Sequence, residues 1–227
     1  MKFKKLKLYT NKLESELKFY SETLGFKILE QNSFSFTIKI GWSELCFEKT
    51  DNSYKYHYCF LIPANKLEQA LKWMEKRTNV IKLEKNRKIQ NFKSWNADSF
   101  YFLDASGNIA EFIARYDLKN NNNSDFDISK VIGINEMGMP TANIKKLNNQ
   151  LETALETEFW KGDLERFGTN GTQEGIFLLP NFSLKSVWFP TLIKIKPEPF
   201  EAIIKNNGKE YFIKYKNEEL FTTTVNV

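Results

Sequence analysis

The stretch LESELKFYSETLGF, residues 13–26, has the spacing of a short amphipathic helix that ends at a glycine. Apolar side chains recur every three or four residues and therefore share one face; they are Leu13, Leu17, Tyr20 and Leu24. Gly25 can take the left-handed backbone conformation that closes a helix. The sequence thus predicts a helix here, preceded by a strand at residues 3–9.

Strand patterns follow this helix at about residues 27–31, 34–40 and 44–49. In the second stretch apolar and polar side chains alternate, which predicts a shared inward face for Phe34, Phe36, Ile38 and Ile40. These elements make one βαβββ unit. A second unit is predicted from a strand at 56–62, a helix with Leu67, Leu71 and Met74 on one face, and strands near 80–84, 98–103 and 108–114.

A second stretch, DASGNIAEF at residues 104–112, is typical of a turn that leads into a strand. Together with residues 13–26 it resembles the vicinal oxygen chelate superfamily, which includes glyoxalase I, fosfomycin-resistance enzymes, extradiol dioxygenases and bleomycin-binding proteins. The resemblance implies an α+β fold of tandem βαβββ modules, which form two glyoxalase-like domains with cup-shaped mixed sheets. It covers residues 3–115 through these two motifs and residues 128–160 weakly.

The segment 118–127 is polar and rich in asparagine, so it is the best candidate for a linker. We therefore expect an N-terminal domain of two modules at 1–117 and a divergent C-terminal domain at 128–227. The latter shows a third unit, with a strand at 131–139 and a helix near 144–155, and then only strand signals, at 187–189, 192–195, 202–204 and 211–215. Four units predict a monomeric pseudo-dimer, with a homodimer as the alternative.

The chain has 227 residues and a formal net charge of +5, from 33 basic and 28 acidic side chains. The lysines are dispersed among glutamates, which is typical of a solvated surface and argues against nucleic-acid binding. We expect neither a membrane span nor a signal peptide, and hence a cytoplasmic protein. Cys46 and Cys59 lie in apolar, strand-like surroundings, as reduced core cysteines do.

Members of the superfamily hold a divalent metal through His, Gln or Glu side chains on particular strands, and the resemblance assigns these positions. Lys5 stands where the superfamily usually has a first-strand histidine, and an ammonium group has no lone pair for a metal. The metal ligands that the resemblance implies are His57, Glu111 and Glu136, of which His57 is the only histidine in the chain. Lys5 and Trp188 are further candidates for residues that line the cavity.

Two arrangements of these residues follow from known members of the superfamily. In the fosfomycin-resistance arrangement, Lys5 and Glu111 share one cavity and form an ion pair in place of the metal, while His57 and Glu136 share the other. In the extradiol arrangement, His57 and Glu111 share a cavity with Lys5. Neither arrangement brings three good ligands together.

The resemblance leaves two classes of function open, and no catalytic residue is assigned. The first is the binding of a small molecule in a concave sheet cavity whose metal site is degenerate. The alternative is a metal-dependent lyase or dioxygenase that acts on a small oxygen-rich substrate. The resemblance implies a divalent metal (Ni, Zn, Mn or Fe) as the cofactor of such an enzyme. A protein without any cofactor is an equal expectation. If a metal is bound, His57→Ala should abolish its binding and Lys5→His should strengthen it.

Overall fold

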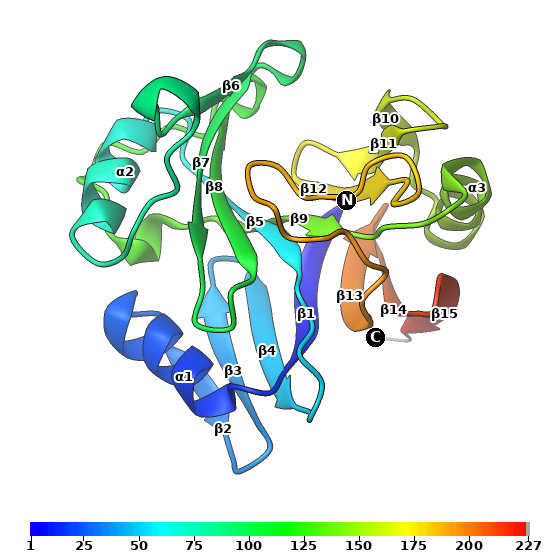
Figure 1. Ribbon diagram of the computed structural model, residues 1–227, viewed down its shortest axis with the longest axis horizontal. Coiled ribbons are helices and arrows are strands. Elements are labelled where there is room, and N and C mark those ends of the chain that lie inside the picture. Colours follow the sequence, from blue (N-terminus) through cyan, green and yellow to red (C-terminus); the bar gives the residue numbers. More distant parts are fainter. Residues whose placement is uncertain (226–227) are drawn as a thin grey trace.

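Two mixed sheets form most of the computed structural model, which describes residues 1–225 (Figure 1). The seven-stranded sheet has the order β15 (Glu219–Val225), β14 (Lys209–Lys216), β13 (Phe200–Asn206), β1 (Lys2–Thr10), β4 (Ser43–Lys49), β3 (Ser35–Ile40) and β2 (Ile28–Gln31). The eight-stranded sheet has the order β10 (Phe159–Gly162), β11 (Phe167–Thr172), β12 (Gly175–Pro180), β9 (Gly133–Gly138), β5 (His57–Ile62), β8 (Ile109–Arg115), β7 (Ala97–Leu103) and β6 (Gln90–Phe92). The predicted α+β fold of tandem βαβββ modules is confirmed.

Each sheet takes strands from both sides of the segment 118–127. In the seven-stranded sheet, β1 pairs with β4 in parallel and with β13 antiparallel. In the eight-stranded sheet, β5 pairs with β8 in parallel and with β9 antiparallel. The division of the sequence into domains 1–117 and 128–227 stays a prediction, and the sheets join one half to the other.

Three α-helices accompany the sheets: α1 (Leu13–Lys18), α2 (Leu67–Glu75) and α3 (Ile144–Leu155). Helix α1 continues into a π-helical turn at Phe19–Thr23 and ends before Gly25, whose φ of +79° is the predicted left-handed closure. Helix α1 packs on β3 and β4, α2 on β7 and β8, and α3 on β11 and β15 (Figure 1). None of the helices among residues 1–225 has the length and apolar character needed to cross a membrane.

The main core lies against one face of β5 and β8, and the functional candidates lie on the other. Tyr58, Phe60 and Ile62 of β5 belong to the main core, as do Ala110, Phe112 and Ala114 of β8. Because side chains alternate along a strand, the odd-numbered positions face the opposite side. All residues of both strands are buried, including these odd-numbered ones. We call this second side the site face.

Several local predictions were wrong. Residues 80–84 form only an isolated bridge from Val80 to Phe102, and the outer strand of this unit is β6. Segments 187–189 and 192–195 form a loop with a single bridge between Val187 and Lys194. Phe34 is 70% exposed in the turn before β3, because the inward alternation starts only at Phe36. The cysteines Cys46 and Cys59 are buried and free, as predicted.

The DASGNIAEF motif forms a turn that is held against α1 by buried carboxylates. Asp104 accepts hydrogen bonds from the backbone N–H groups of Ser106 (3.0 Å) and Asn108 (2.8 Å). Glu16 of α1 accepts a second bond from the Ser106 N–H at 2.9 Å, while its other carboxylate oxygen is buried without a partner. Burial, reinforced by the nearby Asp104, raises the pKa of Glu16 to about 9.

Glu16→Gln is expected to stabilise the protein at alkaline pH. The native state holds the proton of Glu16 more tightly than the unfolded chain, where the pKa is near 4.5, so this residue lowers stability progressively as pH rises from about 4.5 to about 9. The amide keeps the acceptor for Ser106 but carries no charge. We expect a gain of about 1–3 kcal/mol at pH 8, shrinking toward pH 5, in urea unfolding. The exposed Glu14→Gln on the same helix is the control; a gain that does not depend on pH would contradict this account.

Candidate metal centre in the second sheet

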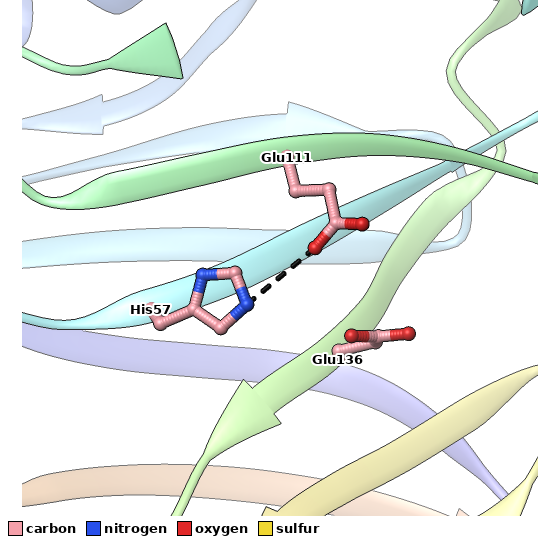
Figure 2. Close-up of side chains that lie close together, drawn as sticks. All are labelled: His57, Glu111 and Glu136. Carbon is pink, nitrogen blue, oxygen red and sulfur yellow. Dashed lines mark ion pairs between the residues drawn. The ribbon is translucent and has the colours of Figure 1, made fainter. Parts of the chain in front are cut away.

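Three titratable side chains meet on the site face of the eight-stranded sheet (Figure 2). They come from adjacent strands: His57 from β5, Glu111 from β8 and Glu136 from β9. The strand register explains their meeting, because Cys59 lies opposite both Glu111 and Glu136, and His57 is two residues before Cys59 on the same face. One ligand atom from each residue lies within 4.8 Å of the other two, and all three residues are buried.

His57 presents a free ring nitrogen to the cluster. Its Nδ1 lies 3.1 Å from the carbonyl oxygen of Ile109, which identifies Nδ1 as the protonated nitrogen. Its Nε2 lies 3.4 Å from a carboxylate oxygen of Glu111. Burial lowers the pKa of His57 to about 4, so the ring is neutral at pH 7 and Nε2 carries a lone pair.

The two carboxylates differ in how their charge is balanced. Glu136 forms an ion pair with the guanidinium of Arg115, whereas no lysine or arginine among residues 1–225 forms an ion pair with Glu111. Burial raises the pKa of Glu111 well above its usual value, and the neighbouring Glu136 adds to the shift. With both carboxylates ionised, the cluster therefore has one more negative charge than Arg115 can balance.

Arg115 is one residue of this site that the sequence reasoning missed. It is fully buried, donates from Nε to Asn135 Oδ1 at 2.8 Å, and its guanidinium contacts the rings of Trp95 and Trp160, 5.4 and 5.3 Å from their centroids. A signal was present in the sequence, because Arg115 follows Glu111 by four residues in an apolar strand and so shares its face.

An aromatic cavity of about 230 Å³ opens over the cluster. Besides the three titratable residues and Lys185, its lining is apolar and mostly aromatic: Phe92, Trp95, Tyr101, Phe167, Leu178, Trp188 and Phe189. The ring of Trp188 is buried, with its centroid 5.0 Å from that of His57. Trp188 also packs on Gly138, where a Cβ atom would come within 2.6 Å of the indole ring. A planar, mostly apolar molecule fits such a lining.

Comparison with known proteins identifies the family of the N-terminal half of the chain. Residues 2–112 match the model of the Glyoxalase/Bleomycin resistance protein/Dioxygenase superfamily. This part of the chain belongs to that superfamily. The resemblance seen in the sequence is thereby confirmed for this part of the chain.

Two solved structures cover almost the whole chain. A putative dioxygenase from Bacillus subtilis aligns over 99% of this chain and 84% of its own, with 12% identity and a TM-score of 0.63. A glyoxalase I variant from Zea mays aligns over 98% of this chain and 92% of its own, with 9% identity and a TM-score of 0.56. At these identities the likeness shows the fold alone. A search among curated proteins found no significant match.

Both arrangements expected from the superfamily place Lys5 wrongly. Lys5 lies on β1 in the other sheet, half-exposed, with its Nζ 3.9 Å from a carboxylate oxygen of Glu44, and it lines a different cavity of about 370 Å³. The expected ion pair between Lys5 and Glu111 does not form. The reason is strand pairing: β5 pairs with β9, so Glu136 joins His57 and Glu111, whereas β1 pairs with β13.

The residues of the cluster fit a divalent metal ion. One neutral imidazole and two carboxylates are a donor set that Zn, Mn, Fe and Ni accept. Ligand atoms about 2.0–2.2 Å from one ion lie roughly 3 Å apart, close to the 3.4 Å between His57 and Glu111. The carbonyl of Ile109 orients His57 as a metal-binding histidine is normally oriented, and a cation would balance the charge of Glu111.

Proposed function

We propose that this chain binds a divalent metal ion through His57, Glu111 and Glu136 and acts as a metal-dependent lyase or dioxygenase on a small, oxygen-bearing molecule with a planar apolar body. The observation that carries the proposal is the buried meeting of three ligand atoms within 4.8 Å of one another beneath an aromatic cavity. The carboxylate of Glu111 supports it, because no lysine or arginine among residues 1–225 pairs with it and a bound cation would balance its charge.

Each residue of the site has a part in this proposal. When bound, the ion supplies Lewis-acid activation of a substrate oxygen. Arg115 holds Glu136 in place through its ion pair, and Ile109 holds the ring of His57 through Nδ1. The aromatic lining, with Trp188 packed against His57, binds the planar body and excludes water from the reacting end.

A metal-free binding protein is the second candidate, and one observation favours it. The charges and hydrogen-bonding groups of the cluster can find partners without a metal ion. Arg115 neutralises Glu136, and a protonated Glu111 can donate a hydrogen bond to the free Nε2 of His57. The aromatic cavity would then hold a small molecule without changing it.

Metal content separates the two candidates. We expect purified protein equilibrated with Ni, Zn, Mn or Fe(II) to retain about one ion per chain by mass spectrometry, and His57→Ala, which removes the nitrogen ligand, to retain less than about a tenth of that. Lys5→His is the matched control: it adds an imidazole to the other sheet, so the content should not change. Circular dichroism checks that the variants fold. No retained metal under any condition would favour the binding protein, and unchanged content in His57→Ala would refute the assignment of the site.

A further inference from the structure

A second, larger cavity adjoins the aromatic one, and the two share part of their walls. It has a volume of about 470 Å³ and shares Lys185 and Phe189 with the aromatic cavity. Both shared residues belong to the loop between β12 and β13, which also carries Trp188. A molecule whose planar end lies beneath Trp188 would therefore extend past Lys185 into this outer cavity.

The outer cavity is basic. Its charged lining residues are Lys82, Arg166 and Lys185, with Glu84 as the only acid. Among residues 1–225, no ion pair includes any of the three cations. The outer cavity thus carries more positive charge than its own residues balance.

Lys185 lies at the junction and is the most enclosed of these cations. Its side chain is half-buried, with Nζ 4.5 Å from the ring centroid of Phe167. Burial, with a smaller contribution from Arg166, lowers its pKa, which reflects a charge held without a counter-ion. Two other enclosed cations of the chain are paired: Arg115 with Glu136, and Lys7 with Glu48 and Glu201. Lys185 lacks such a partner within the described chain.

We infer that the ligand of this protein is an aromatic anion, whose ring lies in the aromatic cavity and whose carboxylate or similar anionic group is bound by Lys185. Arg166 and Lys82 attract the anion from farther out. An ammonium group in a partly desolvated site strengthens a charge-assisted hydrogen bond to an anion, and the aromatic walls provide the area that holds the ring. This inference specifies the class of ligand for the proposed function. It rests on the proposed function only for which end of the ligand reacts.

Three probes of one shape test this inference: 3-phenylpropanoate, its neutral amide, and the cationic 3-phenylpropylamine. Binding is measured by isothermal titration calorimetry on the full chain, with EDTA and again with Zn²⁺. We expect the wild type to bind the anion at least about tenfold more tightly than the amide, and the amine most weakly. Lys185→Met should bind the anion no more tightly than the amide, while its affinity for the amide should stay within about twofold of the wild-type value. Lys72→Met, an exposed lysine on α2, should behave as the wild type.

Each other outcome has a distinct meaning. Equal binding of anion and amide by the wild type, a preference that survives in Lys185→Met, or no binding of any probe would overturn the inference. If the anion binds more tightly than the amide only with Zn²⁺, and equally so in Lys185→Met, the metal ion binds the anionic group. That result would overturn the inference and leave the proposed function intact. A preference that persists with EDTA in a protein that binds no metal would refute only the proposed function.

Discussion

Arg115→Met is expected to destabilise the protein by about 3–5 kcal/mol, because it leaves Glu136 as a buried charge without a partner. Arg115 is fully buried, and its guanidinium pairs with Glu136, which is itself 2% exposed. The substitution also removes the hydrogen bond to Asn135, and no other arginine or lysine among residues 1–225 forms an ion pair with Glu136. Urea unfolding of metal-free protein measures the loss.

The double variant Arg115→Met/Glu136→Gln tests whether the ion pair is the cause. Removing both charges should recover a large part of the lost stability, since an apolar or neutral pair avoids the uncompensated charge. The loss in Arg115→Met should also be smaller at pH 5 than at pH 8, because a protonated Glu136 needs no partner. The exposed Arg166→Met is a control with the same change of side chain. A double variant as unstable as the single one would mean that packing, and not charge, explains the effect.

Glu111→Gln is expected to change stability and metal binding in opposite directions. In the metal-free protein it removes a buried carboxylate whose pKa is raised by burial and by Glu136, so we expect a gain of about 1–3 kcal/mol at pH 8. A neutral amide oxygen is a weaker ligand for a divalent ion than a carboxylate, so metal affinity should fall by about 10- to 100-fold. A variant that is less stable without metal would show that the charge of Glu111 is balanced in the native protein.

The same residue should make metal binding depend on pH. Because burial and the neighbouring Glu136 raise the pKa of Glu111 well above its usual value, an ion must displace the proton from the protonated fraction of the metal-free carboxyl group. Affinity should therefore rise from pH 6 to pH 8, and binding should release protons, as measured by calorimetry in two buffers of different ionisation enthalpy. His57, with a pKa of about 4, does not titrate in this range. Affinity that stays constant over the range would contradict the role of Glu111.

Patterns over a few residues were enough to predict much of the fold. The helix spacing of residues 13–26 with its closing Gly25, and the turn at residues 104–108, depend on contacts between near neighbours in the chain. Strands were likewise predicted at residues 56–62 and 108–114, where β5 and β8 lie, although burial of both faces hid which side would carry function. The family, matched over residues 2–112, follows from the same local motifs.

The composition of the site was decided by tertiary structure. Side-chain alternation gives the face of a residue but not the neighbouring strand, so the sequence left open whether Glu136 would meet His57 and Glu111 or lie apart from them. The pairing of β5 with β9 brings the three together, and the pairing of β1 with β13 takes Lys5 to the other sheet.

Two further residues became part of the site only through the fold. Arg115 acquires its role from a partner, Glu136, on another strand of the sheet. Lys185 reaches the cavity on an irregular loop, which has no periodicity for sequence analysis to detect. The sequence by itself therefore determined the modules and their motifs, because these depend on contacts between near neighbours. Only the tertiary structure decided which modules share a cavity, because that depends on strand pairing between residues far apart in the chain.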